Sequence, residues 1–217
     1  MRITSIERQP RRQRANIFID GRFALALSLE VLAQAGLRPG DELNETRLEV
    51  LRQAEARHAA MAAALRLLSF RPRSEAELRQ RLARRGTIPV LVDESIDRLR
   101  HSGLVDDEAF ARSWVESRDQ VSPRSRRLLA AELRGKGVAR QIVQESLADL
   151  DEEDAAYRAA ARRARSLATL PYADFRRRLG DFLLRRGFGY ETVRSTVTRL
   201  WKEVVQPPAG DVSGHWD

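Results

Sequence analysis

A nineteen-residue pattern of apolar positions occurs three times along the chain, over 81–99, 132–150 and 182–200. Each copy has a glycine at its sixth place, and these glycines are 51 and 50 residues apart. Self-similarity at a fixed period is the signature of a repeat protein. The matched positions are Leu78, Leu129 and Leu179; Leu82, Leu133 and Leu183; Gly86, Gly137 and Gly187; Val92, Val143 and Val193; Ile96, Leu147 and Val197; and Leu99, Leu150 and Leu200.

Each copy predicts the end of one helix, a glycine that takes the left-handed C-cap conformation, and the start of the next helix. A further helix is predicted before each pair, over 58–69, 106–119 and 152–168. The chain is therefore predicted to be mainly α, with three tandem three-helix repeats. Because a unit of about 50 residues buries its apolar faces poorly alone, we expect neighbouring units to stack into an elongated array.

Helix boundaries are indicated by capping residues. Capping boxes at Thr46–Glu49 and Ser74–Glu77 predict two N-termini, and Asp106 or Asp107 predicts a third. Ser122-Pro123 predicts the start of the middle helix of the second repeat. Proline is tolerated in the first turn of a helix, so Pro89 also marks a start. The remaining helices are predicted over 139–149, 171–186 and 189–205.

Residues 1–45 have a different pattern. Alternating apolar residues flank Asp20-Gly21, which is the strongest short signal of a β-hairpin, and the segment "RITSIE" can add a third strand. Ser28 and Gly36 then bound a short helix. We expect these segments: 1–45 as a hairpin and short-helix region, 46–102 as a linker helix and repeat 1, 103–150 as repeat 2, 151–205 as repeat 3, and 206–217 as a flexible tail.

Composition narrows the class of protein. The chain has 217 residues and no cysteine, and its longest apolar run is too short to cross a membrane, so we expect a soluble, cytoplasmic protein. The three histidines form no pair spaced for metal binding, and no phosphate-binding loop or nucleophile motif is present. We therefore predict no enzyme activity, no cofactor and no metal site.

The formal net charge of the chain is +8, and almost all of its basic residues are arginine. A compositional bias of the genome would also favour arginine over lysine, but it does not explain where the charge lies. Cations gather on the middle helix of each repeat, whereas 141–157 has six acids and no base. The candidate partner-binding residues are Arg79, Arg81, Arg84, Arg85, Arg124, Arg126, Arg127, Arg134, Lys136, Arg176, Arg177, Arg178, Arg185 and Arg186.

Two interpretations of this pattern stay open. Cations are favoured at helix C-termini, which accounts for Arg84 and Arg85, and for Arg185 and Arg186. The cluster at 124–127 lies at a predicted helix start, where cations are unfavourable. This cluster therefore favours a binding surface over dipole complementation.

The motifs "LLSFRPRSEAELRQRLARRG", "GLVDDEAFARSWVESR", "SPRSRRLLAAELRGKG" and "FLLRRGF" closely resemble the RecX regulatory family, as does the N-terminal "FIDGRFALAL". The resemblance extends over roughly residues 1–205. One departure is Gly135, where the family pattern usually has a long polar residue and where the helix end is expected to fray. The tail after Gln206 matches nothing.

The resemblance implies a modulator of the RecA recombinase, active in homologous recombination, DNA repair and the SOS response. It implies binding along the RecA–DNA filament, inhibition of RecA ATPase, strand exchange and coprotease activities, and nonspecific binding to single- and double-stranded DNA. We also expect the protein to be a monomer. The alternative is a sequence-nonspecific, architectural DNA-binding protein without a protein target.

Overall fold

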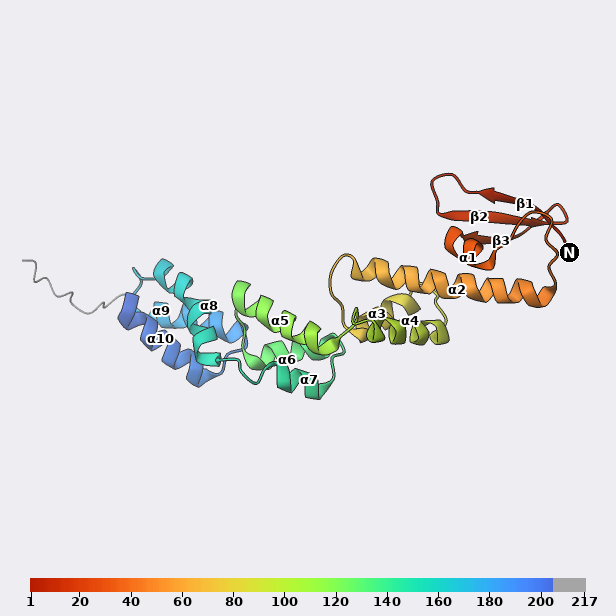
Figure 1. Cartoon of the computed structure of the whole chain (residues 1–217). Helices are drawn as coiled ribbons and strands as arrows, with labels where there is room; N and C mark the ends of the chain where they lie inside the picture. Colours follow the sequence, from red (N-terminus) through yellow and green to blue (C-terminus); the bar gives the residue numbers. More distant parts are fainter. Residues whose placement is uncertain (205–217) are drawn as a thin grey trace, which may run out of the picture. The chain divides into compact units, whose positions relative to one another are not determined.

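Three antiparallel strands begin the chain, in the order β1-β2-β3, with β1 over Ile3–Arg8, β2 over Arg14–Ile19 and β3 over Arg22–Ser28 (Figure 1). Asp20 and Gly21 connect β2 to β3 with positive φ angles of 48° and 76°. The predicted hairpin and the third strand are both confirmed. The structure is a computed structural model that describes residues 1–204 and forms two units, Met1–Val105 and the part that begins at Asp106.

One face of the sheet is covered by two helices. Helix α1 (Leu29–Ala35) is capped by Ser28 and ends at Gly36, as predicted. Helix α2 (Glu45–Leu68) packs its N-terminal half on the sheet and its C-terminal half in the core of the first repeat. This single helix is therefore shared by two hydrophobic cores.

The N-terminus of α2 corrects the prediction of a Thr46–Glu49 capping box. The Asn44 side chain accepts the hydrogen bond from the Arg47 N–H at 2.8 Å, and Asn44 is the N-cap. Leu43, before the cap, and Leu48, in the first turn, are buried in the same core. Such a contact, called a hydrophobic staple, fixes where the chain enters the helix. It favours Asn44 over Thr46 as the cap, a choice that the sequence alone does not determine.

The first repeat consists of the C-terminal half of α2 with α3 (Glu75–Ala83) and α4 (Pro89–His101). Gly86, between α3 and α4, has a φ of 83°, the left-handed conformation predicted for it, and it follows the C-cap of α3, which is Arg84. The repeated apolar positions of both helices are buried together in one core. None of the helices within residues 1–204 combines the length and apolar character needed to cross a membrane.

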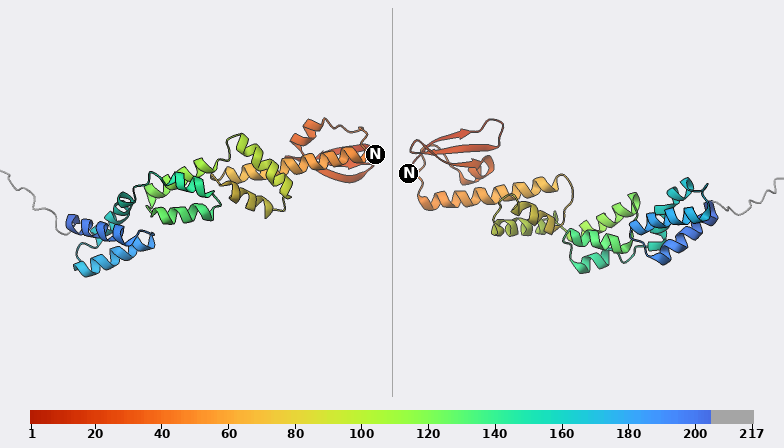
Figure 2. Two further views of the ribbon diagram at one scale, coloured as in Figure 1. Left: turned by 90° about the horizontal axis from the view of Figure 1, so that it is seen from below. Right: turned by 180° about the vertical axis from the view of Figure 1, so that it is seen from behind.

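The second unit contains two further three-helix repeats. The second repeat has α5 (Asp107–Val121), α6 (Arg126–Gly135) and α7 (Arg140–Ser146), and the third has α8 (Glu152–Ser166), α9 (Tyr172–Arg185) and α10 (Tyr190–Val204) (Figures 1 and 2). Each has its own buried core that contains the repeated apolar positions. The predicted class, three three-helix repeats preceded by a small β region, is confirmed. The predicted tail, 206–217, lies outside the described residues.

The start of α6 differs from the prediction. Ser125, and not Ser122, is the N-cap, because its side chain accepts from the Leu128 N–H at 3.2 Å. Pro123 precedes the helix and is buried. At its other end, α6 keeps Gly135 as its last helical residue.

The second and third repeats are joined by direct contacts. The Ser125 N–H donates to the Arg186 carbonyl oxygen at 3.1 Å, and the Arg186 guanidinium donates to the Pro123 carbonyl at 3.0 Å. On another side, Arg158 makes two hydrogen bonds to the Asp119 carboxylate, at 2.7 and 2.8 Å. These two repeats therefore stack within one unit, whereas an elongated array of all three stays a prediction.

Candidate partner-binding surface

The tripeptide Pro-Arg-Ser precedes the middle helix in both of the first two repeats, at 72–74 and 123–125. The serines are fully buried N-caps, and Ser74 accepts from the Glu77 N–H at 3.2 Å, as Ser125 does from Leu128. Because the cap fixes the backbone at this point, the arginine just before it is held against its own repeat. The motif thus creates a partly buried cation that needs an acid nearby.

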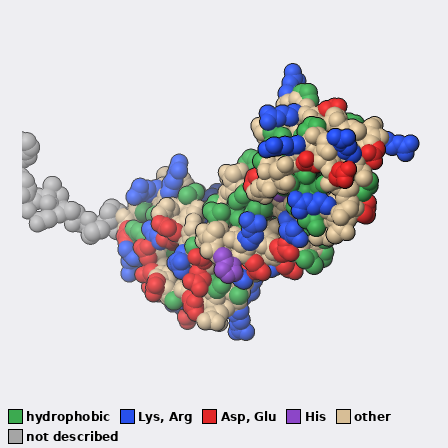
Figure 3. Space-filling view, turned by 45° about the vertical axis from the view of Figure 1, so that its right-hand side comes forward, with side chains coloured by type: hydrophobic (Ala, Val, Ile, Leu, Met, Phe, Trp, Pro, Cys, Tyr) green, Lys and Arg blue, Asp and Glu red, His purple; other side chains and the backbone are tan. Residues whose placement is uncertain are grey.

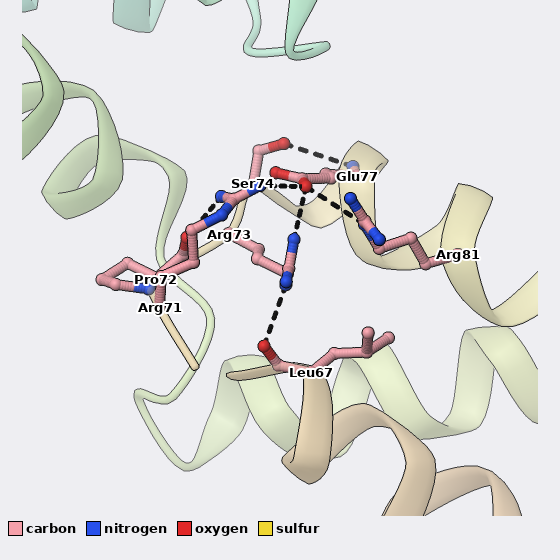
Figure 4. Close-up of polar contacts among 7 residues, drawn as sticks. All are labelled: Leu67, Arg71, Pro72, Arg73, Ser74, Glu77 and Arg81. Carbon is pink, nitrogen blue, oxygen red and sulfur yellow. Dashed lines mark hydrogen bonds and ion pairs between the residues drawn. The ribbon is translucent and has the colours of Figure 1, made fainter. Parts of the chain in front are cut away.

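In the first repeat that acid is Glu77 (Figure 4). Its Oε1 accepts from Arg73 at 2.5 Å, from Arg81 at 3.2 Å, and from Arg71. Arg73 is buried, and its Nε also donates to the Leu67 carbonyl at 2.9 Å. Burial alone would raise the pKa of Glu77, but hydrogen bonds and charge attraction from these arginines outweigh it and hold the pKa below its ordinary value.

In the second repeat the acid is one turn further along the helix. Glu132 accepts from Arg118 at 3.2 Å, from the Trp114 indole N–H at 2.9 Å, and from Arg124. Arg118 and Lys136 also lie over the Trp114 ring, at 4.4 and 4.0 Å from its centroid. The residues of the second repeat that correspond to Glu77 and Arg81 are Leu128 and Glu132, so the acid has moved by four residues.

Half of the fourteen predicted binding residues are held by partners inside the protein. Arg79 pairs with Glu75 and Asp93, Arg81 with Glu77, Arg124 with Glu132, and Arg177 with Asp174. Arg126 donates to the Leu150 carbonyl at 2.6 Å, and Lys136 lies on Trp114. Arg186 points into the junction of the second and third repeats, over the Phe182 ring.

The other seven arginines are exposed, and none has an ion pair within residues 1–204. They are Arg84, Arg85, Arg127, Arg134, Arg176, Arg178 and Arg185. On the face drawn in Figure 3, acidic side chains lie between many of the basic ones. The exposed arginines are therefore the part of the predicted surface that is available to an anionic partner.

Arg124 differs from the rest of the 124–127 cluster, which the charge pattern predicts to be one candidate binding surface. Its side chain is only 30% exposed and is paired with Glu132. Sequence reasoning missed this ion pair, and with it Arg73, Glu77 and Trp114. The repeated Pro-Arg-Ser was the available signal, because a residue type that recurs exactly one repeat apart next to a buried cap indicates a structural requirement.

No cluster of three or more His, Asp or Glu residues within 1–204 is arranged to hold a metal ion. The groups in the two arginine clusters are charged donors and carboxylate acceptors that pair with one another, although the buried Oε2 of Glu77 has no hydrogen-bond partner among the described residues. Their chemistry is that of structural ion pairs.

Comparison with known proteins agrees with this organisation. Family models match residues 1–44 (regulatory protein RecX N-terminal domain), 60–99 (RecX, first three-helix domain), 106–147 (second) and 151–197 (third). A regulatory protein RecX of Lactobacillus johnsonii is 31% identical over 201 residues, covering 91% of this chain and 74% of the relative. One from Mycobacterium sp. (strain KMS) is 43% identical over 146 residues, covering 64% and 80%.

Solved structures agree as well. A crystal structure of regulatory protein RecX has a TM-score of 0.66 at 25% identity and covers 90% of this chain and 98% of its own. The crystal structure of RecX from Lactobacillus salivarius, at 22% identity, shares the fold with a TM-score of 0.60 and covers 68% and 97%. The family models cover the N-terminal region and all three repeats, the relatives are similar in sequence and the solved structures share the fold, so the chain belongs to the RecX family of regulatory proteins.

Proposed function

We propose that this protein binds the RecA–DNA filament and inhibits the ATPase, strand-exchange and coprotease activities of RecA. Family membership is the observation that carries the proposal. The protein acts in the cytoplasm, as a monomer and without an enzymatic activity of its own. Four exposed arginines on the middle helices of the second and third repeats make the contact: Arg127, Arg134, Arg178 and Arg185.

The middle helices of these two repeats each present a pair of exposed arginines on one face. Arg127 and Arg134 on α6 are seven residues apart, as are Arg178 and Arg185 on α9. Residues seven apart lie on the same face of a helix, about 10.5 Å apart along its axis. Two such pairs supply cations that their own repeats leave unneutralised, which suits either acidic side chains or DNA phosphates.

Reversing the α6 pair tests this surface. In the double variant Arg127→Glu/Arg134→Glu we expect inhibition of RecA-dependent ATP hydrolysis on single-stranded DNA to need about tenfold more protein, equivalent to about 1.4 kcal/mol. Folding should be retained, because both side chains are exposed. An acid is favourable at position 127, in the first turn of the helix, and unfavourable at position 134, in the last turn, so the two dipole effects offset each other. Arg124 is left unchanged, because its reversal would place two carboxylates together.

The matched control is Arg47→Glu/Arg66→Glu on α2, which makes the same change in net charge at two exposed positions of the first unit. Equal weakening by both double variants would show that only net charge matters. Full inhibition by the α6 variant, with a circular dichroism spectrum like that of the parent, would contradict a contact through α6.

The salt dependence of binding separates the proposal from the architectural alternative. A protein that binds only DNA would bind naked single strands as well as it binds filaments, with an affinity that falls steeply with salt. The proposed regulator should co-sediment with preformed RecA filaments at a salt concentration where binding to naked DNA is already lost. Loss of both at the same salt concentration would favour the alternative.

A further inference from the structure

A groove of about 960 Å³ lies between α9 and α10 in the third repeat. All of its lining residues belong to these two helices, which lie side by side in the views of Figures 1 and 2. The third helix of the repeat, α8, packs against both α9 and α10 but contributes nothing to the groove. The groove is therefore a face of the helix pair that the repeat itself leaves open.

The floor of the groove is apolar and contains a glycine. Leu184, Val193 and Val197 line it together with Gly180, which lies in the interior of α9. Glycine in the interior of a helix is unfavourable relative to alanine. A Cβ at this position would lie 3.7 Å from the Val193 Cγ1, which is an ordinary contact. Packing therefore does not require glycine at position 180. The absence of a side chain there keeps the groove deep.

Tyrosine and arginine side chains form the rim. Tyr172 is 43% exposed, and its ring lies edge-on to Trp201 with centroids 5.1 Å apart, whereas Tyr190 is 81% exposed. Arg176 and Arg194 are exposed and have no ion pair within residues 1–204. Tyrosine and arginine around an apolar centre are the residues that dominate binding energy at protein–protein interfaces.

The composition of the groove decides what kind of partner fits it. Nucleic acid binding depends on several cations that neutralise phosphates. Here Arg177 is already paired with Asp174 at 2.9 Å, and Asp181 also lines the groove, so the net positive charge is small. The apolar floor would stay empty beneath a phosphate backbone. A second copy of this chain is also disfavoured, because each copy carries a net charge of +8.

We propose that this groove binds an amphipathic helix of a partner protein, with its apolar face on the floor and acidic side chains beside Arg176 and Arg194. Helix-in-groove docking places residues at i, i+3, i+4 and i+7 against such a floor. Opposite charge at the rim sets the orientation and rejects basic helices. The inference goes beyond the proposed function, because it assigns a separate docking site for a protein segment.

The test uses a synthetic amphipathic helix with leucines at i, i+3, i+4 and i+7 and glutamates beside them, labelled with fluorescein. Fluorescence anisotropy with the full chain should show binding, and a peptide with lysines in place of the glutamates should bind at least about tenfold more weakly. Gly180→Leu, which fills the groove, and Tyr190→Ala, which removes an exposed rim residue, should each weaken binding by about tenfold or more.

The matched controls are Gly135→Leu, at a helix position with no atom within 4 Å of a new Cβ, and Phe70→Ala, an exposed aromatic residue in the first unit. Both should bind the peptide like the parent. If Gly180→Leu fails to fold, Tyr190→Ala and Arg176→Glu/Arg194→Glu carry the test, since these side chains are exposed. No binding of the glutamate peptide, equal binding of the lysine peptide, or unchanged binding by the folded groove variants would each overturn the proposal. So would an oligonucleotide that displaces the peptide and is itself weakened by Tyr190→Ala.

Discussion

Glu77→Gln is expected to lower the free energy of unfolding of the first unit by about 3 kcal/mol or more, the range found when one partner of a buried ion cluster is removed. Glu77 is the common acceptor for three arginines, and Arg73 among them is buried. A neutral amide would leave these cations without an acid in a partly dry environment. Urea denaturation of the full chain, with hydrogen exchange over α3 and α4 to assign the loss to this unit, measures the effect.

The pH dependence of the same variant has a definite sign. The folded-state pKa of Glu77 lies below its unfolded value, so its contribution to stability is complete above the unfolded pKa of about 4.3 and is lost as the pH falls through the folded value. The parent should therefore lose this contribution on acidification. In Glu77→Gln that part of the acid dependence should be absent.

The matched control is Glu94→Gln, which removes an exposed ion pair with Arg57. Exposed pairs contribute about 0–1 kcal/mol, so this variant should unfold almost like the parent. Equal losses in Glu77→Gln and Glu94→Gln would show that the arginine cluster of the first repeat is a solvated surface feature.

Gly187→Ala is expected to destabilise the second unit by about 3 kcal/mol. The residue has a φ of 87°, which costs a residue with a side chain about 1–2 kcal/mol. In addition, a Cβ would lie 2.5 Å from the Ser125 Oγ and 3.0 Å from the Leu128 Cβ, at the N-terminus of α6. Relief of this overlap must either rotate the Ser125 hydroxyl out of its capping position or move the second and third repeats apart, at a further cost of about 1–3 kcal/mol.

The equivalent glycine of the first repeat is the natural control for this variant. Gly86 has a φ of 83°, but a Cβ there would meet no atom within 4 Å. Gly86→Ala should therefore show only the backbone strain, and the difference between the two variants measures the contact between the second and third repeats. If the two losses are the same in thermal melts monitored by circular dichroism, the junction is not tightly packed.

Most of the fold could be predicted from the sequence, because the pattern of leucine, valine and glycine repeats in register. A helix face buries the same positions in each copy, and a left-handed glycine follows the middle helix each time, so periodicity alone identifies the repeats. The two capping errors, at Thr46 and at Ser122, have a common cause. Both segments offer more than one capping residue, and the choice depends on neighbours that are buried only in the folded state.

The candidate surface could be predicted only in part. Counting charges finds where arginines gather, but not which of them face an acid across a helix turn or from another helix. Arg124 reaches Glu132, eight residues away, and Arg186 reaches Pro123 across two repeats. Such contacts depend on the directions of side chains in the folded structure, which the pattern of charges along the sequence does not give.

The acid that pairs with the arginines lies four residues later in the second repeat (Glu132) than in the first (Glu77). This difference limits which helices can be exchanged between the repeats. If the α3 sequence were grafted in place of α6, Arg124 would find a glutamate at position 128, but position 132 would become arginine. Trp114 and Arg118 of α5 would then face a cation in place of the carboxylate that they now share. A middle helix therefore cannot be exchanged between repeats by itself. The smallest piece that can be transplanted is the first helix of a repeat together with the middle helix whose carboxylate pairs with it.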